Sequence, residues 1–219
     1  MKLPERLHLK TLRNITKFKP IERNFYLRET IEVAEELLGQ LLVRVIDKNL
    51  MAVRITEVEA YRGLLDPASH AYRGKEGRAR IMFGDVGYAY VYLSYGVHYC
   101  INVVAKSEDQ EAGAILIRSG EPVIGYQFMK LFHDREKCKI SSGPGNLTKS
   151  LNINASYNGY DLTAGTELYI SRGWLNKGEK IVSSTRVGIS RATDKKWRFL
   201  IAGNCTVSKK PFLEGYNSL

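Results

Sequence analysis

The sequence contains few of the residues that build metal centres or disulfide frameworks. Its 219 residues include three cysteines and four histidines, with no Cys-x-x-Cys pair and no Cys/His spacing typical of zinc or iron–sulfur sites. The cysteines, Cys100, Cys138 and Cys205, are odd in number and widely separated. We therefore expect free thiols in a reducing cytosol, and neither a metal ion nor an organic cofactor.

Long apolar runs are also scarce. Residues 1–20 lack the apolar core that a signal peptide needs. Residues 86–105 carry no formal charge and are long enough to span a membrane, but tyrosine, serine, histidine and asparagine occupy their middle. With 44% hydrophobic and 26% charged residues, the composition is that of a soluble globular protein. We expect a monomer that does not contact a membrane.

Acidic residues are outnumbered by basic ones. The 33 lysines and arginines, against 23 aspartates and glutamates, give a net charge of +10. Together with a pI near 9.5, this favours a polyanionic partner, because each phosphate that a basic side chain neutralises releases counterions. The charge alone leaves two interpretations open: a protein that binds nucleic acid, or a soluble protein that is merely basic.

The periodicity of apolar residues predicts one α+β domain, a single mixed domain with a curved, mostly antiparallel β-sheet and a few flanking helices. Residues 1–25 are basic and weakly patterned, and we interpret them as an N-terminal extension to a domain at 26–219. Thr30 is the expected N-cap of a first helix, which Gly39 ends. Further helices are expected at 125–133 and 146–151, and strands at 40–46, 51–61, 88–93, 97–105, 114–119, 168–171, 181–187 and 199–202.

Residues 64–87 form a long predicted loop between two strands. Four glycines interrupt it, and it carries four basic side chains, Arg73, Lys75, Arg78 and Arg80. Long loops inside a compact domain are usually functional. This loop is therefore a candidate part of a binding site.

The strand before this loop ends in two carboxylates. Side chains alternate across a strand, so Val53, Ile55, Glu57, Glu59 and Tyr61 are expected to share one face. The carboxylates either point to solvent, which is the commoner case, or one of them is held in a partly dry cleft. A carboxylate in a dry cleft has a raised pKa and can move protons near neutral pH.

Tyr95 is expected at the tip of a hairpin, beside a glycine that frees the turn. In a basic protein an aromatic side chain there can enter a duplex and fill the gap left by an extruded nucleotide. The alternative is a tyrosine that folds back onto its own hairpin.

A pocket with flat aromatic walls is a second hypothesis. If Tyr92 and Asn102 face the same cleft as Glu59, Tyr61 and His70, the walls can stack a planar, and even a cationic, base. A core of stacked tyrosines is the alternative, and it does not explain a carboxylate in the same place.

Several motifs together resemble the alkyladenine (3-methyladenine) DNA glycosylases. They run in the order of that family over roughly residues 26–203. The motifs are Thr56-Glu57-Val58-Glu59-Ala60-Tyr61, Asp66-Pro67-Ala68-Ser69-His70, Met82-Phe83, Tyr90-Val91-Tyr92-Leu93-Ser94-Tyr95-Gly96, Cys100-Ile101-Asn102, Ile115-Leu116-Ile117-Arg118, Ser142-Gly143-Pro144 and Arg186-Val187-Gly188-Ile189.

The resemblance implies a base-excision repair enzyme that flips alkylated or deaminated purines out of duplex DNA and hydrolyses the N-glycosidic bond without a lyase step. It also implies a single mixed domain built on a curved antiparallel sheet. Residue by residue, the resemblance implies that Glu59 activates the attacking water and that Arg118 lies near this water and the target backbone. It implies that the flipped base is enclosed by Tyr61, His70 and Tyr92. It also implies that Asn102 clashes with the 2-amino group of guanine and that Tyr95 intercalates into the duplex.

The chain departs from the family pattern at Leu64-Leu65, where Pro-Glu is usual, and at Ala79, where Asn is common. These departures concern contacts with DNA and the range of substrates rather than the chemistry. The resemblance implies a location at the bacterial nucleoid, within the cytoplasm, or otherwise in a nucleus.

Two rival functions use part of the same pattern. A non-enzymatic binder of flipped or single-stranded bases would keep the aromatic residues and the basic loop but would not need Glu59. An enzyme that acts on free nucleosides would have little use for Tyr95 or for the net charge of +10.

Binding to duplex DNA is expected to weaken steeply as salt is added, because the released counterions drive association. Fluorescence anisotropy with a labelled duplex, repeated over a series of salt concentrations, measures the dependence. A dissociation constant that does not change with salt would argue against a DNA partner.

Overall fold

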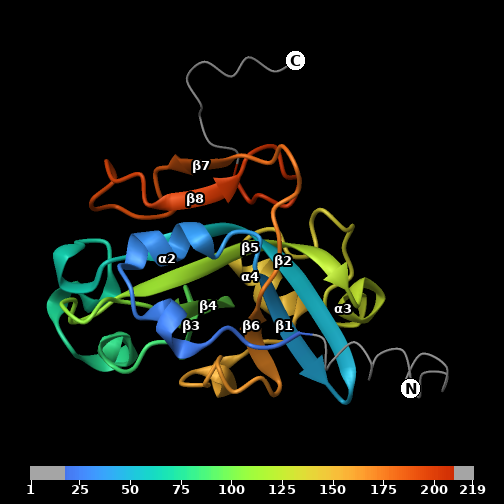
Figure 1. Cartoon of the computed structure of the whole chain (residues 1–219), viewed down its shortest axis with the longest axis horizontal. Coiled ribbons are helices and arrows are strands. Elements are labelled where there is room, and N and C mark those ends of the chain that lie inside the picture. Colours follow the sequence, from blue (N-terminus) through green and yellow to red (C-terminus); the bar gives the residue numbers. More distant parts are fainter. Residues whose placement is uncertain (1–17, 210–219) are drawn as a thin grey trace.

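An eight-stranded sheet forms the centre of the molecule (Figure 1). The structure is a computed structural model, and it describes residues 18–209. All strand pairs in the described part of the chain are antiparallel. The strands are β1 (Leu41–Ile46), β2 (Asn49–Tyr61), β3 (Ala89–Ser94), β4 (His98–Val104), β5 (Ala114–Ile124), β6 (Leu168–Ser171), β7 (Ile181–Ser184) and β8 (Arg198–Ile201). With the helices described next, the sheet confirms the α+β class predicted from the sequence.

Short helices flank this sheet. The α-helices are α2 (Thr30–Glu36), α3 (Tyr126–Phe132) and α4 (Pro144–Ser150). The predicted loop at 64–87 contains most of the 3-10 helices, which are η1 (Arg23–Tyr26), η2 (Gly63–Leu65), η3 (His70–Arg73), η4 (Gly77–Phe83) and η5 (Ala155–Tyr157). None of the helices between residues 18 and 209 is both long and apolar enough to cross a membrane.

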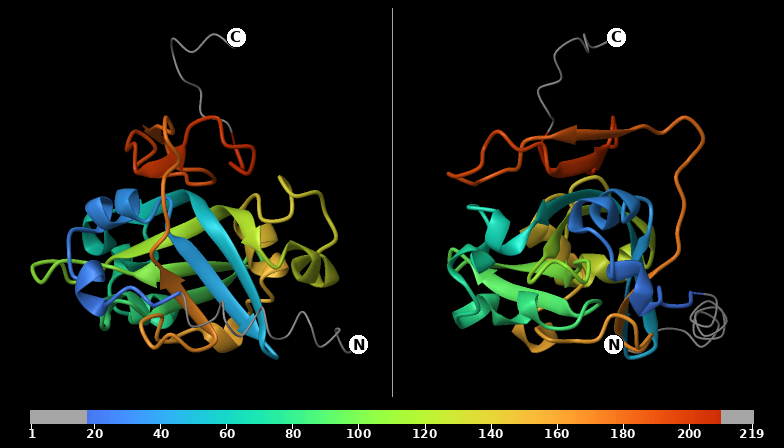
Figure 2. Two further views of the ribbon diagram at one scale, coloured as in Figure 1. Left: turned by 45° about the vertical axis from the view of Figure 1, so that its right-hand side comes forward. Right: turned by 60° about the vertical axis from the view of Figure 1, so that its left-hand side comes forward.

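Strand β2 pairs with three other strands and therefore holds the sheet together. One edge of β2 pairs with β5 over most of the length of β2. The other edge is shared by two strands: β1 pairs near the start of β2, and β8 pairs near its end. Strand β8 also pairs with β7. Figures 1 and 2 show β7 and β8 above the rest of the sheet, with α2 below them in Figure 1.

The first helix begins differently from the prediction. Its N-cap is Glu29, whose carboxylate accepts hydrogen bonds from the backbone N–H groups of Ile31 at 2.6 Å and Glu32 at 3.4 Å. The hydroxyl of Thr30 instead donates to the carbonyl of Ala105 at 2.9 Å. The prediction of Thr30 as N-cap is wrong because a long-range partner takes up the hydroxyl that would have capped the helix.

A β-bulge in β2 overturns the predicted alternation of faces. The pairing register with β5 shifts on both sides of Glu57. Because one extra residue reverses the alternation, Val53 and Ile55 share the main apolar core with Val58 and Ala60. The two carboxylates and Tyr61 therefore lie on the opposite face from Val53 and Ile55, and the prediction of one shared face is wrong.

The cysteines do not all remain free. Cys138 and Cys205 form a disulfide across 67 residues of sequence, whereas Cys100 is free and buried. The expectation of free thiols is therefore wrong for two of the three, and the reducing compartment inferred from them loses its basis. Spacing could not show this pair, because one cysteine lies between α3 and α4 and the other after β8.

The start of the described chain packs against the domain. Pro20 pairs with Ser171 of β6, and the side chains of Ile21 and Phe25 are buried in the main core. Residues 18–25 of the predicted extension thus contribute to the domain's packing. Residues 1–17 lie outside the described residues.

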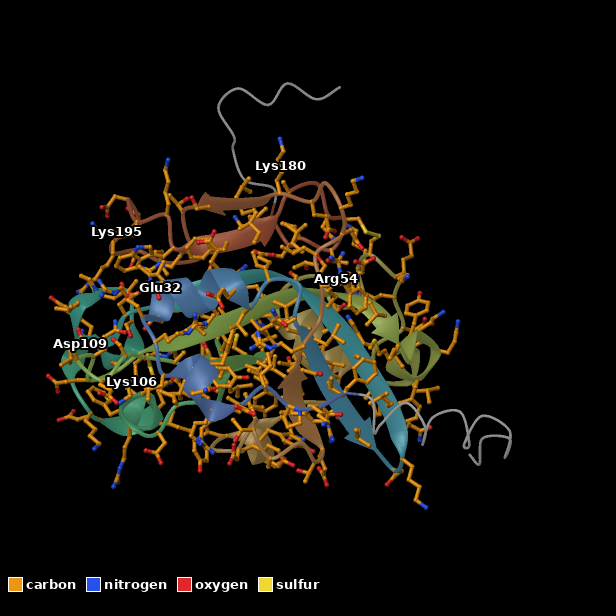
Figure 3. All side chains as sticks on the ribbon, in the orientation of Figure 1. Glu32, Arg54, Lys106, Asp109, Lys180 and Lys195 are labelled. Atoms are coloured by element: carbon orange, nitrogen blue, oxygen red, sulfur yellow. A yellow bond between two sulfur atoms is a disulfide. The ribbon has the colours of Figure 1, made fainter. Side chains whose placement is uncertain are left out.

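A buried arginine connects β2 to the segment that precedes β7. Arg54, labelled in Figure 3, is 2% exposed, and its guanidinium lies 2.6 Å from Glu179 and 2.5 Å from Glu121. The hydrogen bond from Arg54 lowers the pKa of Glu179 from 4.5 to about 2. The ionised carboxylate is therefore favoured in the folded protein.

This shift predicts a specific loss of stability in acid. Because the folded-state pKa of Glu179 lies below its ordinary value, its contribution is present above about pH 4.5 and disappears as the pH falls toward 2. We expect Glu179→Gln to lose less stability than the wild type between pH 6 and pH 3, measured as the urea midpoint. The exposed Glu108→Gln serves as control, and an equal loss in all three proteins would contradict the prediction.

Candidate active site

A cavity of about 930 Å³ opens between the sheet and the loops at 61–78 and 187–191. It brings together six of the seven residues predicted for the site. Tyr61 comes from the end of β2, His70 from η3, Tyr92 and Tyr95 from β3 and the hairpin tip after it, Asn102 from β4, and Arg118 from β5.

Glu59 is the seventh, and it lies directly behind the cavity wall. Its side chain is fully buried. The hydroxyl of Tyr61 donates to Oε2 at 2.9 Å, the backbone N–H of Val187 donates to Oε1 at 2.7 Å, and Nη1 of Arg118 lies 3.3 Å from Oε1. All three of these partners line the cavity, so the carboxylate is one side chain away from it.

His70 and Tyr92 form one continuous aromatic wall. Their ring centroids are 4.8 Å apart with the planes at 77°, an edge-to-face contact. The Nδ1 atom of His70 lies 2.8 Å from the hydroxyl of Tyr90. Burial and then the charge of Arg78 lower the pKa of His70, so its ring is neutral near pH 7.

Tyr61 and Asn102 are held in fixed orientations. Burial and then the charge of Glu59 raise the pKa of Tyr61 well above its usual value, so its hydroxyl keeps the proton that it donates. Asn102 is 3% exposed, and its Nδ2 donates to the carbonyl of Tyr90, its partner across the β3–β4 hairpin, at 2.9 Å. The amide of Asn102 is therefore unable to rotate freely in the cavity wall.

Tyr95 projects from the tip of the β3–β4 hairpin. Its side chain is 88% exposed, so the folded-back alternative does not apply. Its φ of 51° lies in the left-handed region, which bulky residues rarely adopt, and the following Gly96 has a φ of 69°. Strain of this kind is concentrated at functional sites, and here it holds an aromatic ring at the cavity mouth.

Exposed arginines surround the mouth of the cavity. Arg73 and Arg78 come from the predicted basic loop, and Arg191 comes from the segment between β7 and β8. Lys75 and Arg80 line a neighbouring hollow of about 520 Å³ together with Arg78. These cations give the cavity and the hollow beside it a positive charge, which favours an anionic ligand.

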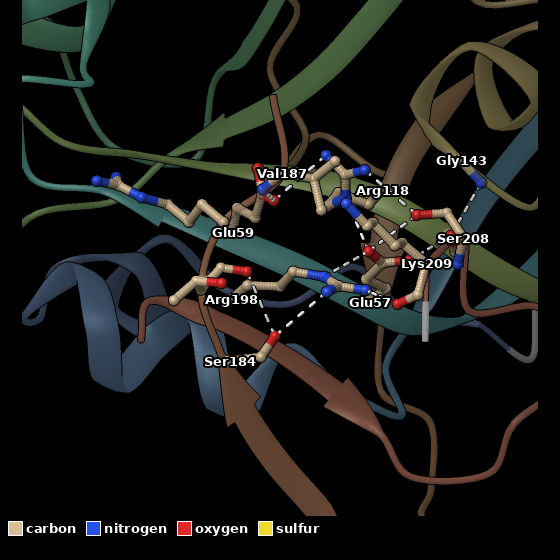
Figure 4. A network of polar contacts seen from close by, with 12 residues as sticks. Glu57, Glu59, Arg118, Gly143, Ser184, Val187, Arg198, Ser208 and Lys209 are labelled. Carbon is tan, nitrogen blue, oxygen red and sulfur yellow. Dashed lines mark hydrogen bonds and ion pairs between the residues drawn. The ribbon is translucent and has the colours of Figure 1, made fainter. Parts of the chain in front are cut away.

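Sequence reasoning gave no role to Glu57, which is the centre of a buried polar network (Figure 4). Arg118 and Arg198 each donate from Nε to its Oε1 at 2.8 Å. Its other hydrogen bonds come from Ser119 at 2.9 Å and from the backbone N–H and hydroxyl of Ser208 at 2.7 and 2.9 Å. A second carboxylate inside an apolar strand was the sequence signal that could have pointed to Glu57. Its partners could not be found in this way, because they come from β5, from β8 and from the chain after β8.

The network fixes Arg118 beside Glu59. Burial alone would raise the pKa of Glu57, but the charges of Arg118 and Arg198 outweigh it and hold the pKa below its usual value. The ionised Glu57 therefore anchors one end of the Arg118 guanidinium, while the other end reaches Glu59 and the cavity. Within residues 18–209, no cluster of three or more His, Cys, Asp or Glu side chains could hold a metal ion.

The site thus combines a buried carboxylate, an aromatic-walled cavity that can stack a planar base, and an exposed ring and arginines along the cavity rim. Comparisons with known proteins identify the family. The family model described as methylpurine-DNA glycosylase (MPG) matches residues 24–205.

Relatives from distant organisms match over nearly their whole length. A protein of Carboxydothermus hydrogenoformans is 44% identical over 191 residues, which cover 87% of this chain and 99% of the relative. One of Borreliella afzelii is 43% identical over 197 residues, covering 86% and 100%, and one of Methanocella arvoryzae is 42% identical over 195 residues, covering 87% and 96%. All three bear the name "Putative 3-methyladenine DNA glycosylase".

The chain therefore belongs to the methylpurine-DNA glycosylase family. As a member of that family it is a DNA glycosylase that acts in the repair of alkylated purines. The resemblance seen in the sequence motifs is confirmed.

Removing the charge of Glu57 is expected to destabilise the protein strongly. Among the described residues, Glu57→Gln leaves the buried Arg198 without its carboxylate partner and leaves Arg118 with Glu59 alone. Breaking a buried ion pair by removing one partner typically costs about 3–5 kcal/mol. Urea unfolding of this variant measures the loss, with the exposed Glu111→Gln as a matched control. A loss of less than about 1 kcal/mol, the range of exposed ion pairs, would show that the network does not carry this charge balance.

Proposed function

We propose that the protein excises alkylated or deaminated purines from duplex DNA by hydrolysing the N-glycosidic bond, and that it leaves the DNA strand intact. The observation that carries this proposal is the position of Glu59, fully buried yet one side chain behind an aromatic-walled cavity. Family membership supports the same reaction class.

The cavity suits a purine that has been turned out of the duplex. Its volume of about 930 Å³ is ample for one nucleotide. The wall formed by His70 and Tyr92 lies on the same cavity as Tyr61, so a base entering it would contact aromatic rings. Asn102 would exclude guanine by contact with its 2-amino group, because the hydrogen bond to Tyr90 keeps its amide from moving aside.

Hydrolysis needs a base for the attacking water and a negative charge near the sugar. Glu59 would accept a proton from a water whose oxygen attacks the sugar carbon, while the purine leaves with the electron pair of the broken bond. The same carboxylate would favour the positive charge that develops on the sugar. Arg118, which contacts Glu59 and lines the cavity, would hold the carboxylate in place.

Alkylation at a ring nitrogen makes the purine a cationic group that leaves readily. A neutral deaminated base such as hypoxanthine leaves less readily and needs a proton, which water could supply. No lysine of the described chain lines the cavity, so a Schiff-base intermediate and strand cleavage are not expected. Trapping of a covalent complex with borohydride would overturn this part of the proposal.

The mouth of the cavity would bind the duplex. Tyr95 would fill the gap left by the extruded nucleotide, and the arginines beside it would contact the phosphates. An enzyme of free nucleosides would need neither feature.

Glu59→Gln is expected to bind a lesion duplex like the wild type but to lose excision by about 10³-fold or more, because it removes both the proton acceptor and the charge. Single-turnover release of hypoxanthine from a duplex measures the reaction, and anisotropy measures binding. Glu121→Gln, which alters a carboxylate paired with Arg54 outside the cavity, is the matched control.

Excision by Glu59→Gln at a rate near that of the wild type would remove Glu59 from this role. Absence of excision by the wild type on every damaged purine tried would favour the non-enzymatic binder of flipped bases instead.

A further inference from the structure

A second buried ion pair lies next to Glu59 and has no part in the reaction described above. Asp66 and Arg186 are both fully buried, and their two hydrogen bonds are 2.5 Å from Nη1 to Oδ2 and 2.8 Å from Nη2 to Oδ1. Asp66 lies between η2 and η3, and Arg186 lies between β7 and β8. The pair therefore joins the loop that carries His70 to the segment at 187–191, and both of these line the cavity.

Besides Arg118, two groups donate hydrogen bonds to Glu59, and Arg186 is close to both of them. Its guanidinium lies 4.7 Å from the ring centroid of Tyr61, whose hydroxyl donates to Oε2 of Glu59. The next residue in the chain, Val187, donates its backbone N–H to Oε1. One side chain thus supports both of these donors, Tyr61 through its ring and Val187 through the backbone.

Further contacts leave Arg186 little freedom. Nη1 also donates to the carbonyl of Ala60 at 2.9 Å, and the guanidinium lies 5.1 Å from the ring centroid of Trp197. Asp66 in turn accepts a hydrogen bond from the backbone N–H of Ala68 at 3.0 Å, which shapes the turn before His70. The planar guanidinium is therefore fixed by a bidentate partner and by aromatic rings, and an ammonium group cannot reproduce this planar, bidentate geometry.

We propose that Arg186, held by Asp66, is a positioning residue that sets the direction of the Glu59 carboxylate for hydrolysis. This inference rests on the proposed function of Glu59. Stability alone is a weak explanation for the pair, because well-packed apolar residues of similar volume are often at least as stabilising as a buried ion pair.

Arg54 provides a control for the general effect of altering a buried arginine. It lies on β2 like Glu59, is 2% exposed, and forms close ion pairs with two carboxylates, but it does not line the cavity. Arg54→Lys and Arg186→Lys both keep the charge and remove the planar guanidinium. We therefore compare the two variants at the same temperature, after urea unfolding has shown how much stability each has lost.

Arg186→Lys is expected to lower single-turnover excision of hypoxanthine by about 10- to 100-fold, the size of effect that misplacing a catalytic group produces. The dissociation constant for the lesion duplex should change little, because neither Arg186 nor Asp66 lines the cavity. Arg54→Lys should excise at the rate of the wild type whatever stability it loses.

The rate constant and the dissociation constant, measured side by side, provide a readout that a purely structural role would not move. A displaced Glu59 carboxylate lowers the single-turnover rate constant at saturating enzyme while duplex binding is kept, whereas a loss of folded protein lowers only the amount of active enzyme. Arg54→Lys should keep both constants at their wild-type values. If Arg186→Lys does not fold, Asp66→Asn, which keeps the shape of the partner, should show a smaller loss of the rate constant.

A single-turnover rate constant equal to that of the wild type in the folded Arg186 or Asp66 variant would overturn the proposal, while inactivity of Glu59→Gln would still support the proposed function. Excision by Glu59→Gln at the wild-type rate would instead remove the basis of both.

Discussion

Charge balance inside the protein is the constraint on which the site depends. Three carboxylates, Glu57, Glu59 and Asp66, are fully buried, and the ion pairs that match them come from Arg118, Arg186 and Arg198. A buried charge without a partner costs several kcal/mol, so each carboxylate needs its arginine in place. The arginines come from β5, β8 and the segment between β7 and β8, and the site is therefore complete only when the whole sheet has formed.

The bulge in β2 makes this arrangement possible. Without the register shift at Glu57, the two glutamates would occupy the core face that Val58 and Ala60 fill. With it, Glu57 anchors Arg118, Arg118 contacts Glu59, and Glu59 lies behind the cavity wall. Because strands rather than mobile loops carry these groups, the candidate catalytic carboxylate is held in a preorganised position.

Local patterns were enough to predict the fold class, most of the strands and the position of Tyr95 at a hairpin tip. The family motifs were enough to predict that five residues share one site, and all five line the cavity: Tyr61, His70, Tyr92, Asn102 and Arg118. The sequence could not reveal the bulge, the N-cap at Glu29, the disulfide or the partners of Glu57 and Asp66. Each of these depends on residues far apart in the chain, whereas periodicity and spacing report only on neighbours.

In the proposed reaction, the Glu59 carboxylate acts on the sugar of a nucleotide held in the cavity. A crystal structure with a duplex in which a cationic pyrrolidine replaces the target sugar would show this contact. We expect the pyrrolidine inside the cavity, with its nitrogen within hydrogen-bond reach of Glu59, about 2.6–3.2 Å, or joined to it through one water. A pyrrolidine bound elsewhere, or separated from Glu59 by the wall of Tyr61 and Val187, would contradict the proposed reaction.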